Sequence, residues 1–420
     1  MAEILSIPAS VNFDESIANY EIHSHQPYAS SSFNNSDEIR IIVQNQDLSI
    51  LPSNSVLHIF GRLTNADGTD ATQNIHFTNN AIAYLFDEIR YELNGIEIDR
   101  CKYVGHTTTM KSLVSLTPPQ LNRAENAGIL NMEFNTRMSL QDGYFDVSVP
   151  LGMIFGFAED YKKIVMNAKH ELILIRARSD LNSIIQTGEG ADEQFKVQIN
   201  KVEWLVPYVL PSDNNKIKLL KFIEKDPLIS MSFRSWEMFE YPLIPSSTRV
   251  MWQIKSSTQL EKPRYVIVGF QTGRKDKRKK SASYFDHCDI TNVKLFLNSQ
   301  SYPYGNLNLN FNQNQYSILY DMYANFQSSY YGRDSEPILK LDTFKSLAPL
   351  IVIDCSKQNE FLKQTSVDVR LEFEARNNIP VETTAYCLII HDRIVQYKPI
   401  SGIVKKMSSS GGGKMKVVGG

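Results

Sequence analysis

The order of sequence elements in the first half of this chain recurs in the second half, about 200 residues later. The segment IRYELNG (89–95) resembles VKLFLNS (293–299), and ELILIRAR (171–178) resembles VRLEFEAR (369–376). The asparagines of the first pair lie 204 positions apart, and the final arginines of the second pair lie 198 apart. A near-constant offset of half the chain indicates a duplicated domain, so the fold has to be one that can be built twice in 420 residues.

The repeated unit has the pattern of β-structure. Apolar and polar residues alternate over 89–93 and again over 96–98, and Asn94-Gly95 stands between them. Because Asn-Gly tolerates the positive φ angles of a two-residue type I′ turn, this segment is predicted to be a hairpin. In each half a short amphipathic helix follows, and then a proline-flanked apolar strand, at 147–155 and 347–355.

Similar patterns predict about eight short strands in each half and few helices. Further strands of the first half are expected at 38–45, 56–63, 144–150, 170–178 and 195–209. Those of the second half are expected at 229–236, 249–255, 265–272, 293–297, 350–354, 367–375 and 385–391, and helices at 107–117 and 316–329. Eight antiparallel strands in two sheets is the jelly-roll number. The predicted fold class is therefore all-β, with two consecutive eight-stranded jelly-roll sandwiches.

These elements predict five regions. Residues 1–37 are polar and irregular and are expected to form an N-terminal arm, followed by a first jelly roll at 38–210. Residues 211–227 hold Pro211, a Ser-Asp-Asn-Asn cluster and Pro227, which is typical of a linker. A second jelly roll is expected at 228–400, and residues 401–420 are predicted to be a flexible, glycine-rich tail.

Composition excludes several functional classes. Lys plus Arg number 44 and Asp plus Glu 46, giving a formal net charge of -2, whereas a dedicated nucleic-acid coat would be strongly basic. The four cysteines are far apart and none forms CxxC, so buried, reduced thiols are predicted rather than a zinc site or a disulfide framework. No secretory signal or membrane-spanning run is recognised, and a soluble protein made in a reducing compartment is expected.

The sequence lacks the common catalytic motifs. It contains no P-loop, no HExxH, no GxSxG and no GxGxxG after a strand. The His23/His25 pair lacks a nearby third ligand, and an exposed arm is the favoured interpretation over a metal site. His287 and Cys288 are expected to lie on a strand, where neighbouring side chains point to opposite faces and a thiolate–imidazole pair is unfavourable. We expect no enzyme activity, no metal and no cofactor, although two distant carboxylates of a glycan-cleaving site stay an open alternative.

The most basic segment is RKDKRKK, in a loop between two predicted strands. Its six basic residues are Arg274, Lys275, Lys277, Arg278, Lys279 and Lys280. Three interpretations stay open: a solvated surface loop, a nuclear-import address, and a weak contact with nucleic-acid phosphates. Aromatic residues are not interleaved with the basic ones, so base stacking is not supported.

Seven tyrosines lie between residues 302 and 331. A glycan-binding or nucleic-acid platform, as in a lectin-like module, is one interpretation. Packing within a β domain or at a subunit interface is the favoured one.

Several ordered segments resemble those of the major capsid proteins of the double jelly-roll lineage. The similar stretches are SVLHIFGRLT (55–64), NNAIAYLFDEIRYELNGIEIDR (79–100), PRYVIVGFQTGR (263–274), VKLFLNSQSYPY (293–304) and YDMYANFQSSYYG (320–332). The resemblance is strongest to the capsid proteins of Polinton/Maverick elements and adintoviruses, within the wider adenovirus- and virophage-like lineage. It covers about residues 10–400.

The resemblance implies a structural role without catalysis. Members of this family form trimers whose six sandwiches make a pseudo-hexagonal capsomer, and the capsomers tile an icosahedral shell around a DNA genome. Their strands stand roughly perpendicular to the shell, and long loops form its outer surface. The resemblance therefore implies self-association, a penton or minor capsid protein as a partner, and location in the virion after synthesis in the host cytoplasm, with assembly there or in the nucleus. The Gly-Gly end resembles the cleavage sites of related viral proteases, and a flexible end without function is the alternative.

Overall fold

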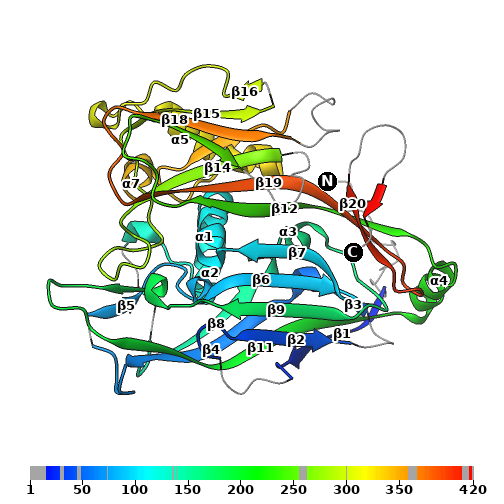
Figure 1. Cartoon of the computed structure of the whole chain (residues 1–420). Coiled ribbons are helices and arrows are strands. Elements are labelled where there is room, and N and C mark those ends of the chain that lie inside the picture. Colours follow the sequence, from blue (N-terminus) through cyan, green and yellow to red (C-terminus); the bar gives the residue numbers. More distant parts are fainter. Residues whose placement is uncertain are drawn as a thin grey trace, which may run out of the picture.

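The computed structural model consists of two β-sandwiches stacked side by side (Figure 1). It describes residues 16–28, 33–44, 49–72, 74–134, 137–138, 140–254, 263–298, 300–357, 367–408 and 416–418. The strands of both sandwiches run along one common direction, so the molecule has two ends where the loops gather.

Each sandwich is an antiparallel jelly roll with two four-stranded sheets at its centre. In the first, one sheet has the order β1 (Ile17–His25), β11 (Phe195–Pro211), β4 (Val56–Asn65) and β8 (Tyr144–Pro150), and the short β3 (Ser49–Ile50) also pairs with β11. The facing sheet has the order β2 (Glu38–Val43), β9 (His170–Arg176), β6 (Phe86–Leu93) and β7 (Ile96–Lys102).

The second sandwich repeats this topology strand by strand. One sheet has the order β12 (Ile229–Tyr241), β19 (Thr383–Tyr397), β14 (Pro263–Thr272) and β17 (Ile351–Asp354). The other has the order β13 (Arg249–Ile254), β18 (Val369–Ala375), β15 (Ile290–Leu297) and β16 (Gln300–Tyr302). In both sandwiches the eighth strand lies between the first and the third, which is the jelly-roll connection. The predicted all-β, doubled jelly-roll fold is confirmed.

The predicted hairpin is the β6–β7 pair. Asn94 and Gly95 have φ angles of 50° and 78°, as a type I′ turn requires. The equivalent turn of the second jelly roll lies between β15 and β16, where Asn298 has a φ of 55°.

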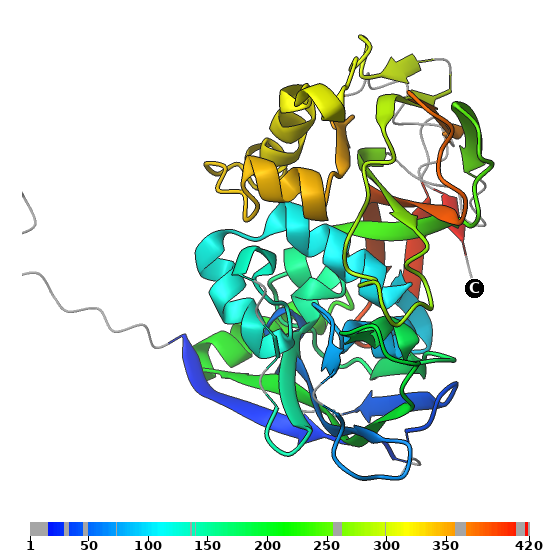
Figure 2. The same cartoon turned by 90° about the vertical axis from the view of Figure 1, so that its left-hand side faces the viewer.

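Helices occupy the same connection in both jelly rolls. Between β7 and β8 lie α1 (Val104–Ser115) and α2 (Pro118–Ala124). Between β16 and β17 lie α5 (Ser317–Ala324), α6 (Phe326–Tyr331) and α7 (Leu341–Leu347), so the predicted helix over 316–329 is divided at Asn325. Figure 2 looks at this helix-bearing end, where the two sets of helices lie side by side. A small sheet of β5 (Ile75–Phe77) and β10 (Ile184–Gln186) lies at the same end.

Two regions predicted to be irregular contain strands. Within the predicted arm 1–37, β1 pairs with β11 from Ile17↔Pro211 to His25↔Trp204. Within the predicted flexible tail 401–420, β20 (Val404–Ser408) pairs with β19, and β21 (Lys416–Val418) pairs with β20. Backbone pairing with a long neighbouring strand overrides the polar composition of these segments. The predicted linker contains α4 (Asp213–Ile223), at the end of the molecule away from the other helices (Figure 1).

The two apolar cores meet where the jelly rolls touch. The core of the first jelly roll includes Met231 and Phe233 of β12 and Val395 of β19. The core of the second includes Met110 and Leu113 of α1. Because each core contains side chains from the other half, the two jelly rolls pack as one body and their relative orientation is determined by side-chain packing.

Candidate functional site at the junction of the two jelly rolls

Strand β12 is an edge strand of its sheet, and the first jelly roll covers it. Helix α3 (Gly156–Asp160) packs directly on β12. A Cβ atom on Gly156 would lie 1.6 Å from the carbonyl oxygen of Arg234, so a side chain at this position cannot be accommodated without a backbone shift. The close approach of these two backbones therefore depends on a glycine in the first jelly roll.

The last residue of α3 forms an ion pair across this contact. Asp160 accepts hydrogen bonds from the Arg234 guanidinium at 2.6 and 2.9 Å and from the Arg234 backbone N–H at 2.8 Å. The same guanidinium donates to the carbonyl oxygen of Tyr330 at 2.7 Å and lies 3.6 Å from the centre of the Tyr330 ring. Arg234 thus links α3 of the first jelly roll to α6 of the second.

A buried lysine forms the centre of the same contact. The Lys111 ammonium on α1 is 2.9 Å from a carboxylate oxygen of Glu159 and 3.0 Å from the Tyr331 hydroxyl, and it faces the rings of Trp236 and Tyr330 at 4.6 and 4.8 Å. Burial is the largest single influence and lowers the pKa of Lys111, but the Glu159 carboxylate and the Tyr331 hydroxyl together outweigh it, so the pKa is raised. The lysine therefore stays charged and is held by groups from both halves.

Asp99 of β7 is a second buried charge at the junction. It accepts hydrogen bonds from the Ser235 hydroxyl at 2.6 Å and from the backbone N–H groups of Phe157 and Arg100, both at 3.0 Å. Burial raises its pKa, and the nearby Arg393 guanidinium, at 3.7 Å, acts in the opposite direction. No local sequence signal singled out these junction residues, because their partners come from distant strands and helices.

The basic loop lies at the helix-bearing end, between β14 and β15, and contacts both jelly rolls. Four of its side chains contact the second jelly roll: Arg274 with Asp286 at 2.6 Å, Lys275 with Glu240 at 2.6 Å, Lys277 with Glu382 at 3.9 Å, and Lys280 with the carbonyl oxygen of Thr272 at 3.2 Å.

The other two basic side chains reach the first jelly roll. The Arg278 guanidinium donates to the carbonyl oxygen of Glu193 and lies 5.6 Å from the centre of the Phe195 ring. The Lys279 ammonium donates to the carbonyl oxygen of Gly190 at 2.8 Å. All six basic side chains therefore have intramolecular partners, and the loop joins the two halves. Its roles as an import address or a phosphate contact stay predictions.

The histidine and cysteine candidates do not converge on a reactive site. His23 lies on a strand rather than on an arm, 2.9 Å from Glu21, and its ring contacts the Tyr208 ring at an angle of 47°. His287 and Cys288 lie in a turn before β15, not on a strand as predicted, and the two side chains still diverge: the imidazole stacks on Phe311 and the thiol faces Thr272. All four cysteines are buried and free of disulfides, as predicted. Within the described ranges no group of three His, Cys, Asp or Glu side chains could hold a metal ion.

Most of the clustered tyrosines are packing residues. Tyr316, Tyr323 and Tyr330 are buried, and the Tyr323 hydroxyl donates to the carbonyl oxygen of Leu113 at 3.0 Å. Tyr304, unlike these three tyrosines, has 95% of its surface exposed. A continuous aromatic platform for a glycan is therefore not formed by these side chains.

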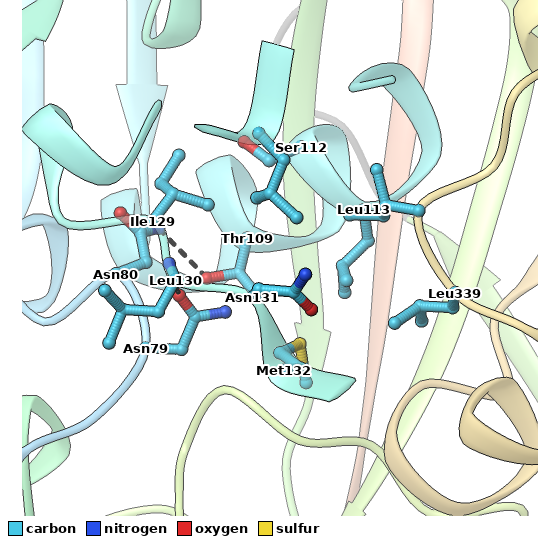
Figure 3. Close-up of a pocket in the computed structure, with 12 residues that line it drawn as sticks. Asn79, Asn80, Thr109, Ser112, Leu113, Ile129, Leu130, Asn131, Met132 and Leu339 are labelled. Carbon is cyan, nitrogen blue, oxygen red and sulfur yellow. Dashed lines mark hydrogen bonds between the residues drawn. The ribbon is translucent and has the colours of Figure 1, made fainter. Parts of the chain in front are cut away.

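Two pockets between or beside the halves are too small for a sugar. The pocket in Figure 3 is lined by Asn79, Asn80 and residues of α1, the 129–132 segment and Leu339, and it has a volume of about 10 Å³. The neighbouring pocket behind Ile82 and Phe86 measures about 20 Å³. Neither is lined by a carboxylate, and each has room for about one water molecule. These two pockets do not supply the paired acids that glycan cleavage would need. A larger hollow of about 570 Å³ beside the basic loop is lined by Asp286 and Asp289, but Asp286 is paired with Arg274 at 2.6 Å and Asp289 lies 3.3 Å from His287.

Two tandem jelly rolls joined through side chains at a shared junction define a double jelly-roll protein. The chain belongs to the double jelly roll-like domain family, which matches residues 75–395. No curated protein matches the sequence. No helix in the described part of the chain is long and apolar enough to cross a membrane.

Solved structures with a similar fold include viral major capsid proteins. The mavirus major capsid protein is 12% identical, with 98% of this chain and 93% of that chain covered and a TM-score of 0.56. The Faustovirus major capsid protein is 9% identical, with 94% and 93% covered and a TM-score of 0.58. A chain from the cryo-electron microscopy structure of the Sputnik virophage is 9% identical, with 97% and 92% covered and a TM-score of 0.61. The likeness covers more than nine tenths of each of these chains and concerns the fold.

Proposed function

We propose that this protein is a major capsid subunit, a structural protein without catalytic activity. The observation that carries the proposal is that the fold of the whole chain, two jelly rolls in tandem, aligns over more than nine tenths of the mavirus major capsid protein. The sequence segments that resemble Polinton/Maverick and adintovirus capsid proteins support the same role and favour that lineage. A capsid subunit acts by contacting its neighbours, and the packed junction holds its two jelly rolls in one fixed arrangement for those contacts.

The subunit is proposed to form a trimer. Three chains with two sandwiches each supply six similar corners, and a ring of six can tile a curved shell. Permanent interfaces of this kind typically bury more than about 2,000 Å². The rigid junction through Lys111 and Arg234 serves this role, because the angle between the two sandwiches determines whether three subunits close into a ring.

The strands are proposed to stand across the shell, with the helix-bearing end outside. The basic loop lies at this end, so under this orientation it does not face the packaged DNA. A penton or minor capsid protein would complete the particle, and the mature protein would reside in the virion after synthesis in the cytoplasm and assembly there or in the nucleus.

Mass photometry and negative-stain electron microscopy of the purified full chain test this proposal. We expect a species of three times the 47.9 kDa of one chain, and pseudo-hexagonal capsomers or closed particles on the grid. A protein that stays monomeric at micromolar concentration, with no ring-shaped particles, would contradict it.

A further inference from the structure

Helix α4 has an apolar side that the two jelly rolls cover only in part. Leu219 is half-buried and Ile223 is 7% exposed, so this side of the helix packs on the protein. Ile217, Leu220 and Phe222 flank that side and are 52%, 55% and 50% exposed. At 100° per residue, these five positions form one apolar arc of which only the centre is covered.

Four lysines accompany this arc: Lys216, Lys218, Lys221 and Lys225, all exposed. Within the described residues none of the four forms an ion pair with a carboxylate. The basic loop at the other end of the molecule is different, because each of its side chains has a partner. Half-exposed apolar residues beside unpaired cations indicate that α4 is a docking surface for an apolar and acidic segment.

The N-terminal segment leaves the described structure at this surface. The carbonyl oxygen of Ser16 accepts hydrogen bonds from the Ser212 backbone N–H at 3.0 Å and from the Asn215 side chain at 3.2 Å, in the first turn of α4. Strand β1 is antiparallel to β11, with Ile17 opposite Pro211. Traced backwards from Ile17, the chain therefore heads in the direction in which β11 continues into α4.

The composition of residues 1–15 is complementary to the α4 surface. This segment, MAEILSIPASVNFDE, carries three carboxylates and no basic side chain, and alternating apolar residues at Leu5/Ile7 and Val11/Phe13. Eleven helical residues span about 16 Å, whereas fifteen extended residues reach about 50 Å. The segment is thus long enough to run along the whole helix.

We propose that residues 1–15 dock along the exposed side of α4 of the same chain, with their apolar side chains on Ile217 and Leu220 and their carboxylates near the lysines. The N-terminal segment then covers an apolar surface at the end of the subunit opposite the other helices. This proposal does not depend on capsid assembly, and it holds for the isolated chain.

Cysteine crosslinking tests the placement in the full chain. We would combine Ile7→Cys with Ile217→Cys, treat the protein with a short bismaleimide, and map crosslinked peptides by mass spectrometry. The four native cysteines are buried, and burial raises the pKa of the thiols of Cys101, Cys387 and Cys288, the last to about 11, so the native cysteines react slowly. The control pairs Ile7→Cys with Val381→Cys, which is 71% exposed and lies beside Thr383, at the opposite end.

The expected result is a 7–217 crosslink within one chain and little 7–381 product. Mixing ¹⁴N- and ¹⁵N-labelled chains separates crosslinks within a chain from those between chains. A crosslink only between chains would overturn the proposal in favour of a second copy on α4, and no enrichment over the control would also overturn it. Particle formation is scored separately by electron microscopy, so failure here is distinguishable from failure of the capsid proposal.

Removal of the segment provides an independent measurement. Deleting residues 2–15 is expected to increase bis-ANS fluorescence and tryptic cleavage after Lys218 and Lys221. In the deletion background, Ile217→Ser with Leu220→Ser should return the dye signal towards that of the full chain, whereas Met251→Ser, at a site 61% exposed on another sheet, should not. An unchanged dye signal and unchanged cleavage after the deletion would contradict the docking.

Discussion

Asn94 and Asn298 make the same pair of hydrogen bonds in the two jelly rolls. The Asn94 backbone N–H donates to Lys169 O at 2.8 Å, and its side-chain oxygen accepts from Lys169 N at 2.7 Å. Asn298 exchanges the equivalent bonds with Asp368, both at 2.9 Å. Each asparagine thus joins the turn after one strand to the start of the strand beside it, and this shared detail is strong support for duplication.

Replacement of Asn298 tests how much this turn contributes. Asn298→Ala removes the side-chain oxygen that accepts from Asp368 N. Alanine also lacks the local hydrogen bonds that let asparagine adopt a positive φ, so we expect the free energy of unfolding to fall by about 1–3 kcal/mol. Asn298→Asp keeps an acceptor oxygen in the same place and is the matched control. Urea denaturation measures both, and equal losses in the two variants would show that the hydrogen bond is unimportant.

Gly156→Ala tests the close contact between α3 and β12. The new methyl group would meet the Arg234 carbonyl oxygen, so the two backbones must separate and the Asp160–Arg234 ion pair must lengthen. We expect a loss of about 3 kcal/mol or more in the free energy of unfolding. Gly190→Ala is the control, because no heavy atom lies within 4 Å of its added Cβ. A thermal melt in which both variants match the original protein would contradict the role of Gly156.

The jelly-roll topology could be predicted from the sequence because its signals are local. Alternation over 89–98, the Asn-Gly turn and the recurrence of Asn94 as Asn298 each lie within a few residues. Strand β1 escaped prediction because its six leading residues are exposed and thus lack the apolar alternation of a half-buried strand. The junction escaped for another reason: Lys111, Glu159 and Tyr331 come from three separate connections, and only the folded chain brings them together.

The Lys111–Glu159 pair is expected to show strong coupling. Lys111→Met leaves the partly buried Glu159 carboxylate with only the Tyr330 and Tyr331 hydroxyls as donors, at 2.8 and 2.6 Å, and should lower the free energy of unfolding by about 3 kcal/mol. Glu159→Gln added to Lys111→Met removes the unpaired charge, so the double variant should be more stable than Lys111→Met alone. Urea denaturation of the original protein, Lys111→Met, Glu159→Gln and the double variant gives the coupling energy between the two side chains. A double variant less stable than either single one would show that the pair is not coupled in this way.

Three buried histidines predict a loss of stability in acid. Burial lowers the pKa of His106, His170 and His391 to about 3, from an ordinary value of 6.5. Below pH 6.5 the unfolded chain therefore binds protons that the folded chain does not, and stability falls as the pH drops from 6.5 towards 3. Each histidine should contribute a loss of about 2 kcal/mol at pH 5.

A substitution at His106 isolates one of these contributions. His106 stacks on Tyr386 and lies 3.2 Å from the Gln271 side-chain oxygen, so His106→Gln keeps a donor for that oxygen. Between pH 7 and 5 the variant should lose about 2 kcal/mol less stability than the original protein, which is the contribution of one buried histidine. Identical slopes for His106→Gln and the original protein would contradict the assignment.

Substitution of Arg278 distinguishes a structural role of the basic loop from a role in nucleic-acid binding. Its guanidinium contacts the first jelly roll through Glu193 and Phe195, and its own carbonyl oxygen accepts from Gln186 N at 2.7 Å. Arg278→Ala should lower the free energy of unfolding by about 1–2 kcal/mol through the lost contacts. Retention of duplex DNA in a gel-shift assay at low salt should not change, because the partners of this side chain are all within the subunit. Lys196→Ala, an exposed change on neighbouring β11, is the control for loss of one positive charge. A large loss of DNA retention in Arg278→Ala alone, with stability unchanged, would instead assign the loop to phosphate contact.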